Sequence, residues 1–139
     1  SVITDTHFAE RDRMGRMLTF VARVLQDYNT ETAVAVPLPV VRGIGVDEPA
    51  AVIINATSGH AQAVGSGNVY ICSSVPSTNA EVCAANTPLT FTNISCVRLS
   101  ADSRETYSFA TWTPTDEGQG ATYTDNIVAG SFGANAYGL

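Results

Sequence analysis

The clearest pattern of apolar and polar positions lies between residues 6 and 27. Apolar residues recur there at spacings of three and four, at Met14, Met17, Leu18, Val21 and Leu25. This spacing places them in one stripe and predicts an amphipathic helix that turns the stripe toward a core. Thr4 or Asp5 is expected to cap the start, because a short oxygen side chain there can accept hydrogen bonds from free helical N–H groups. The polar segment 29–32 ends the predicted helix.

From residue 40 onward, short apolar runs alternate with turn residues, which predicts β-strands. The expected strands are Val41–Val46, Ala51–Asn55, Gln62–Val64, Val69–Ser73, Phe91–Leu99, Tyr107–Trp112 and Asn126–Val128. Pro37 and Pro39 mark a loop before them, and a second loop with Pro76 and Pro88 joins residues 73 and 89. One helix followed by short, glycine-flanked strands suits one part of a larger α/β sheet.

Composition narrows the class of protein. The chain has 139 residues, of which 45% are hydrophobic and 14% charged, which is typical of one folded domain rather than a disordered segment. Thirteen acidic residues against seven arginines, with no lysine, give a net charge of −6. This balance disfavours binding to nucleic acid or to an anionic membrane surface. No apolar run approaches the roughly 20 residues of a membrane-spanning helix.

Three cysteines and two glycosylation sequons bear on the compartment. The cysteines are Cys72, Cys83 and Cys96, and their spacing gives little support to a metal site. Asn55 and Asn93 each begin an N-x-Ser/Thr sequon. Together these features favour a secreted or vacuolar glycoprotein with one disulfide, leaving the third thiol buried or bonded to another chain. Any of the three pairings is open, and three buried reduced cysteines are the alternative.

Two short segments carry candidate catalytic groups. His7 lies where an extended segment meets the predicted helix, a position at which ligand-facing groups collect in open α/β sheets. A neutral imidazole there could act as a general base, although a surface or capping histidine has the same pattern. Gly43–Glu48 combines glycines that allow close backbone approach with two acids that could orient an imidazole. An ordinary acidic turn before Pro49 is the alternative there.

Arginines supply a candidate anion site. Arg11, Arg13 and Arg16 are close together in an otherwise acidic chain, and guanidinium groups suit carboxylate recognition. A solvated helix face is the alternative. No G-x-S-x-G segment or nucleophile-like cysteine turn occurs, and an N-terminal nucleophile at Ser1 fits the helix-first pattern poorly. The chain thus offers a base, an orienting acid and an anion pocket, but no nucleophile.

At this point two motifs resemble those of a known family. Residues 5–17, DTHFAERDRMGRM, resemble the DQHF-x-x-R-x-R-x-GRL segment of the cyanophycinase family, and residues 43–48, GIGVDE, resemble its GIGIDE segment. Residues 64–70 also resemble the hairpin that follows in that family, and the stretch 81–94 resembles its secreted or extended members. The likeness covers nearly the whole chain, as the C-terminal half of the family's sequence.

The resemblance implies a fold and a catalytic apparatus. The fold would be the C-terminal part of a class I glutamine amidotransferase-like, flavodoxin-like α/β sandwich. His7 would be the general base of a Ser-His-Glu triad and Glu48 its orienting carboxylate. The positions of Asp5, Thr6, Arg11, Arg13 and Arg16 match the family's substrate-binding segment. Thr6 replaces the family's usual Gln, which leaves the substrate preference open.

The family's nucleophilic serine lies upstream of these motifs, so the resemblance implies a partner. We expect proteolytic processing before Ser1, a heterodimer with an N-terminal chain of the same precursor, and further pairing into a dimer of heterodimers. The expected reaction is hydrolysis of β-aspartyl (isoaspartyl) peptides, with no cofactor and no metal. Residues 1–27 would hold the histidine motif and helix, 40–72 the core strands and 73–139 a β-rich extension. A catalytically inactive binding or toxin-like protein on the same scaffold is the alternative.

Overall fold

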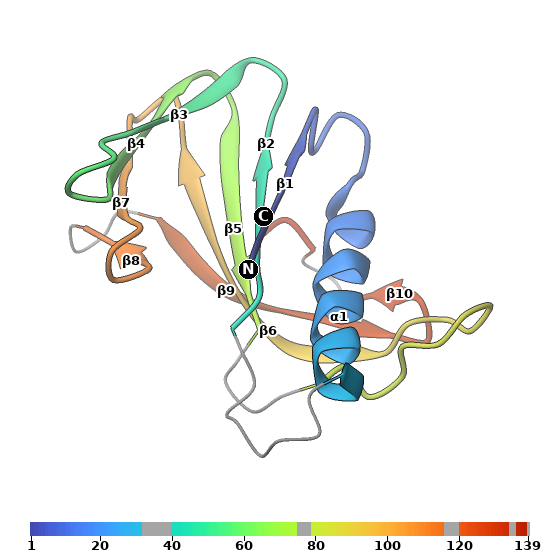
Figure 1. Ribbon diagram of the computed structural model, residues 1–139. Helices are drawn as coiled ribbons and strands as arrows, with labels where there is room; N and C mark the ends of the chain where they lie inside the picture. The colour runs from blue at the N-terminus through green and yellow to red at the C-terminus, as the bar shows by residue number, and fades with distance from the viewer. Residues whose placement is uncertain (32–39, 75–78, 116–119, 134–135, 139) are drawn as a thin grey trace.

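A computed structural model describes residues 1–31, 40–74, 79–115, 120–133 and 136–138 (Figure 1). Within these residues the protein is a mixed α/β structure with one α-helix and two β-sheets. The helix, α1, spans Met14–Glu31. None of the helical structure in this part of the chain is long and apolar enough to cross a membrane.

The larger sheet has six strands. Its order is β1 (Val2–Thr6), β2 (Arg42–Val46), β5 (Asn68–Ser73), β6 (Phe91–Ser100), β9 (Ala121–Val128) and β10 (Ser131–Phe132). The smaller sheet has the order β3 (Ala50–Ile54), β4 (His60–Gly65), β7 (Thr106–Ser108) and β8 (Thr113–Pro114).

Strand direction decides which residues meet. β1 runs parallel to β2, with Thr6 opposite Val46, whereas the other pairs in both sheets are antiparallel. A parallel pair needs a crossover connection, and α1 lies in that connection and packs on the sheet (Figure 1). The carboxyl ends of β1 and β2 therefore lie side by side, although they are 40 residues apart in sequence.

Two hydrophobic clusters form the core, one on each side of the larger sheet. The first includes the predicted helix stripe, whose five residues are each no more than 1% exposed, together with Phe8, Tyr70 and Phe91. The second lies between the two sheets around Ile71, Leu99 and Tyr107. The stripe prediction is confirmed, because its side chains cover the larger sheet as the 3.6-residue period requires.

Glycines in β2 allow α1 and residues 7–13, the histidine loop between β1 and α1, to approach the sheet. A Cβ atom on Gly43 would lie 2.6 Å from Met17 Sδ, and one on Gly45 would lie 2.5 Å from the ring of Phe8. Such separations are far below van der Waals contact, so any side chain at either position would displace its neighbour. The expectation that these glycines permit close backbone approach is confirmed.

The start of the helix differs from the prediction. Residues 7–13 form successive turns, and α1 begins only at Met14. Thr4 and Asp5 lie within β1, so neither caps the helix. His7 and Asp12 have φ values of 51° and 47°, in the left-handed region that interrupts a right-handed helix. The apolar stripe predicts the buried face of the helix, but residues 7–13 show no apolar periodicity that would predict their turns.

Most predicted strands are present, with shifts of one or two residues at their ends. The strand predicted at Tyr107–Trp112 is shorter and ends at Ser108, and the one predicted at Asn126–Val128 begins earlier, at Ala121. Pro37, Pro39 and Pro76 lie outside the described residues.

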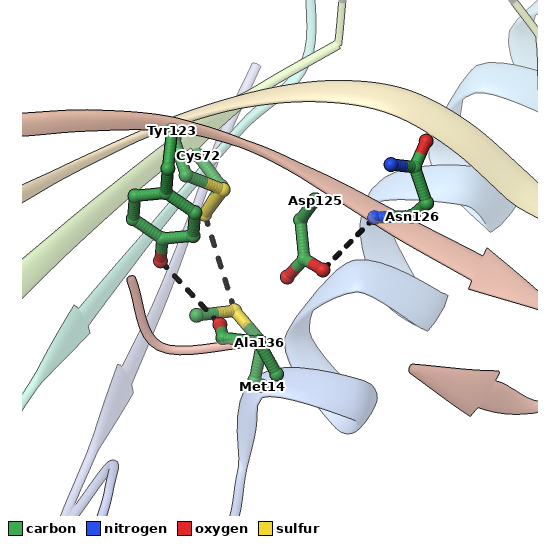
Figure 2. Close-up of a disulfide and its surroundings, with 7 residues drawn as sticks. Met14, Cys72, Tyr123, Asp125, Asn126 and Ala136 are labelled. Carbon is green, nitrogen blue, oxygen red and sulfur yellow. Dashed lines mark hydrogen bonds between the residues drawn. A yellow bond between two sulfur atoms is a disulfide. The ribbon is translucent and has the colours of Figure 1, made fainter. Parts of the chain in front are cut away.

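The strand register decides which two cysteines form a disulfide. Cys72 on β5 and Cys96 on β6 are direct cross-strand partners and form a buried disulfide beside Met14 of α1 (Figure 2). Cys83 is a free, half-buried thiol, and burial raises its pKa. Of the open pairings, the structure therefore has the one that joins neighbouring central strands.

Candidate active site

The structure brings His7 and Glu48 together. His7 follows β1 and Glu48 follows β2, and these strands end side by side because they are parallel. His7 Nδ1 lies 3.1 Å from Glu48 Oε2, and the two side chains are 36% and 61% exposed. The atoms are within ion-pair distance, but their angle is not that of a hydrogen bond, and Nδ1 has no other partner in the described part of the chain.

The backbone at His7 is held in an unfavourable conformation. Its φ of 51° lies in the left-handed region, which few residues other than glycine adopt, although histidine, asparagine and aspartate do so more often than the rest. Hydrogen bonds support the turn: Arg11 N–H donates to the His7 carbonyl at 3.2 Å, and Arg13 N–H donates to the Phe8 carbonyl at 3.0 Å. Such residues persist only where the surrounding structure fixes them, and they cluster at functional sites.

Asp47 fixes the histidine loop to the rest of the site. It is 6% exposed, and its Oδ1 accepts a hydrogen bond from Ala9 N–H at 3.0 Å. Its Oδ2 accepts from Asn68 N–H at 2.9 Å. This one carboxylate therefore joins the histidine loop, the end of β2 and the start of β5. Of the two acids in the GIGVDE segment, Asp47 is structural and Glu48 is left to face the imidazole.

Glu48 is in turn held by Glu10. Glu48 N–H donates to Glu10 Oε1 at 3.0 Å, although Glu10 lies in the histidine loop 38 residues earlier. Together with the hydrogen bond from Ala9 to Asp47, this contact crosses from the loop after β1 to the end of β2 in both directions. The backbones that carry His7 and Glu48 are thus positioned by side chains of each other's segments.

The predicted arginine cluster divides into bound and free groups. Asp5, in β1, has a side chain only 8% exposed and contacts both Arg13, at 3.1 Å, and Arg16. Burial alone would raise the pKa of Asp5, but hydrogen bonds from Arg16 and Arg13 lower it overall. Arg11 is exposed, and its guanidinium has no hydrogen bond or ion pair with the described residues. Of the three arginines, Arg11 is therefore the one whose guanidinium is available to a ligand, while Arg13 and Arg16 share the single carboxylate of Asp5.

Tyr137, near the C-terminus, packs against the histidine loop. The Tyr137 hydroxyl donates to Asp12 Oδ1 at 2.8 Å and accepts from Met14 N–H at 3.3 Å. Its ring lies edge-on to Phe8 and Tyr70, with centroids 6.1 and 5.5 Å apart. Burial raises the pKa of Tyr137. These contacts hold Phe8, the neighbour of His7, against the sheet.

The remaining predicted site residues either form hydrogen bonds through their backbone groups or lie away from His7 and Glu48. The Thr6 N–H donates to Asp5 Oδ1, and the Thr6 carbonyl accepts from Arg13 Nη1. Asn55 and Asn93, the two sequon residues, are exposed. Cys83 lines a cavity of about 400 Å³ beside α1, which contains none of the predicted catalytic residues. Among the residues that the structure describes, no group of three or more His, Cys, Asp or Glu side chains is arranged to hold a metal ion.

Three residues of the site were not predicted from the sequence: Glu10 and Tyr137, which position its backbone, and Asp47 in its structural role. Asp47 binds Ala9, and Glu10 binds Glu48, across 38 positions of sequence in each case. Nothing local in the sequence indicates these contacts. Comparisons of this chain with protein-family models, with curated proteins and with solved structures found no match.

Proposed function

We propose that this chain is the C-terminal part of a processed, cyanophycinase-like serine hydrolase, built on a class I glutamine amidotransferase-like fold. The observation that carries the proposal is the contact between His7 and Glu48 at the ends of neighbouring parallel strands. The two residues lie in separate motifs of the sequence, and the family resemblance implies the role of base for His7 and of orienting acid for Glu48. A histidine with a carboxylate beside Nδ1 is the arrangement that leaves Nε2 free to accept a proton.

The proposed reaction is acyl transfer through a serine on a partner chain. His7 Nε2 takes the serine proton as the serine oxygen attacks the peptide carbonyl carbon, and backbone N–H groups of the partner bind the oxyanion. His7 then gives the proton to the leaving amine as the peptide bond breaks. Water attacks the acyl-serine with the same proton relay and releases the acid. Glu48 stabilises the imidazolium, its contact tightening in the complex.

The free edge of β1 is the place beside His7 at which the proposed partner chain would bind. β1 is the terminal strand of its sheet, and Val2 at its start is 48% exposed. Parallel strands are usually covered on both faces and flanked by neighbours, so a parallel pair at a bare edge is unusual. A partner strand that paired with β1 in the parallel sense would end next to His7. The serine of an elbow after that strand would then lie within reach of Nε2.

Arg11 is the group that we propose for substrate recognition. It lies four residues after His7 in the same loop and its guanidinium is unpaired within the described structure. The free carboxylate of a β-aspartyl peptide is a suitable partner for its paired N–H donors. Arg13 and Arg16 would act indirectly by holding Asp5, and Thr6 would shape the wall of the pocket.

We also propose that the protein is secreted or vacuolar and glycosylated. Asn55 and Asn93 are exposed, and Asn55 Oδ1 accepts hydrogen bonds from the N–H groups of Thr57 and Ser58, at 2.9 and 3.1 Å. Its amide nitrogen is left toward solvent. The buried disulfide is in keeping with an oxidising compartment.

The test is labelling of the native protein with a fluorophosphonate, which reacts with activated serines. His7→Ala is compared with His60→Ala, the matched loss of an exposed histidine on β4. We expect label on a separate polypeptide, a fall of about 100-fold or more for His7→Ala, and no change for His60→Ala. Hydrolysis of β-aspartyl dipeptides should follow the same order. Absence of a labelled partner, or equal labelling of both variants, would overturn the proposal.

A further inference from the structure

A cavity beside α1 is large enough to hold a small molecule and lies outside the candidate active site. Its volume is about 400 Å³, which is within the range of ligand pockets. One wall belongs to α1 and the other to residues 79–90, the yellow-green loop beside the helix in Figure 1. The lining residues are Thr19, Phe20, Arg23, Cys83, Ala84, Thr87 and Leu89. The proposed hydrolase reaction uses none of them.

The loop wall of the cavity is fixed by backbone hydrogen bonds. Val82 N–H donates to the Thr90 carbonyl at 3.1 Å, and Thr90 N–H donates to the Val82 carbonyl at 2.9 Å. The Leu89 carbonyl accepts from Gly130 N–H at 2.8 Å, which ties the loop to the turn between β9 and β10. Because these bonds need no ligand, the cavity is preformed, and binding does not have to order its wall.

Apolar side chains form the body of the cavity. Leu89 and Cys83 pack against the core cluster on the helix side of the larger sheet, and Phe20 adds an aromatic ring from α1. Phe20 is 52% exposed, so part of its ring is not covered by the protein. A ligand with an apolar body would cover these side chains and remove apolar surface from water.

Arg23 is the charged residue among those that line the cavity. Its Nη2 lies 3.9 Å from Asp27 Oδ1, and the two side chains are 49% and 62% exposed. An exposed pair at this distance contributes little to stability, so the guanidinium is able to turn to another acid. Burial raises the pKa of the Cys83 thiol, and Arg23 opposes that shift, which places the guanidinium near the thiol.

The hydroxyl groups of the cavity already use their protons. The Thr19 hydroxyl donates to the Gly15 carbonyl at 2.7 Å, and the Thr87 hydroxyl donates to the Ala85 carbonyl at 3.3 Å. Among the lining side chains, the guanidinium of Arg23 is therefore the strong donor left for a ligand. Its paired N–H groups match the two oxygens of a carboxylate, and such charge-assisted hydrogen bonds are stronger than neutral ones.

We propose that this cavity binds a small amphipathic carboxylate. The apolar body of the ligand lies between Phe20 and Leu89, and its carboxylate pairs with Arg23 in place of Asp27. The apolar walls favour such a ligand over a sugar or a phosphate ester, which would leave several polar groups without partners there. This binding site is independent of the proposed hydrolase activity.

Cys83 reports occupancy of the cavity, because a ligand bound there covers its thiol. The rate of native-state alkylation by iodoacetamide is measured by intact mass, with and without phenylpropionate as the probe. Phenylpropionamide has the same shape without the charge and is the matched ligand control. Arg23→Gln removes the charge of the cavity, and Arg104→Gln, at an exposed arginine outside it, is the matched variant control. Circular dichroism checks the folding of both variants.

We expect a dissociation constant of about 1 mM for phenylpropionate, the affinity that about a dozen non-hydrogen atoms reach at ordinary ligand efficiency. At about 10 mM it should slow alkylation of Cys83 roughly tenfold in the parent and in Arg104→Gln. Phenylpropionamide in the parent, and phenylpropionate in Arg23→Gln, should slow it about twofold or less, because a hydrogen bond to a charged group is worth about tenfold or more in affinity.

An alkylation rate that phenylpropionate at about 10 mM leaves unchanged in the parent would overturn the proposal. Equal slowing by the acid and the amide would also overturn it, because the cavity would then not select a carboxylate. Equal slowing of folded Arg23→Gln and Arg104→Gln by phenylpropionate would overturn the role of Arg23 and with it the proposed ligand class.

Discussion

Replacing Asp125 by Asn is expected to stabilise the protein at neutral pH. Asp125 lies on β9 with its carboxyl directed toward α1 (Figure 2), and it is 2% exposed. Oδ1 accepts a hydrogen bond from Asn126 N–H at 2.9 Å, while Oδ2 has no partner within the described structure. Burial is the main cause that raises the pKa of Asp125 to about 6. The wild-type protein must therefore bury a charge at pH 7.

The pKa sets the size of the effect. The ordinary value is 3.8, so the shift is about two units, and at 1.36 kcal/mol per unit it amounts to about 3 kcal/mol. The unfolded chain loses this proton near pH 4, whereas the folded protein keeps it until about pH 6. Stability associated with Asp125 is therefore complete below pH 4, falls as the pH rises to about 6, and stays low above it.

Urea unfolding of wild type and Asp125→Asn between pH 4 and pH 8 measures this dependence. Asn keeps the acceptor for Asn126 and has no charge to bury. We expect similar stabilities at pH 4 and an advantage for Asp125→Asn that approaches about 3 kcal/mol at pH 8. Asp27→Asn, at a 62% exposed carboxyl, is the control and should change stability by less than about 1 kcal/mol. A difference that does not grow with pH would refute the reasoning.

Two further predictions concern packing and the thiol. Gly45→Ala should lower the free energy of unfolding by about 2 kcal/mol, because its Cβ would overlap the Phe8 ring. Gly133→Ala is the control, since the nearest atom to its Cβ is 3.9 Å away, and it should change the free energy of unfolding far less. Equal losses for the two variants in chemical denaturation would contradict this prediction. In denaturant without reductant, iodoacetamide should add one adduct per chain, at Cys83, as counted by mass spectrometry. In the native state the reaction should be slow, because burial raises the pKa of the Cys83 thiol. Two or more adducts before reduction would mean that the disulfide is absent.

The larger part of the secondary structure follows from patterns along the chain. The apolar residues from Met14 to Leu25 predicted the buried face of α1, because a helix places every third or fourth residue on one side. The glycines at 43 and 45 indicated close packing on β2, since only a residue without a side chain leaves such space. These features depend on local geometry, so neighbouring residues are enough to reveal them.

The candidate site was only partly predictable. The motifs singled out His7 and Glu48 separately, and the parallel pairing of β1 and β2 then placed them 3.1 Å apart. The pairing of Asp5 with Arg13 and Arg16 was not foreseen, because it requires the turns of residues 7–13 to bend the arginines back over β1. Those turns are held by Asp47, which follows β2, a strand distant in sequence.

Sequence by itself thus determined the composition, the amphipathic helix, most strand positions and the chemical types available for a site. The tertiary structure decided which cysteines bond, where α1 begins, which arginine remains free and which carboxyl is buried as a charge. The division has one physical reason. Helical and strand periods act between residues a few positions apart, whereas disulfides, ion pairs and burial depend on segments that only the sheet register brings into contact.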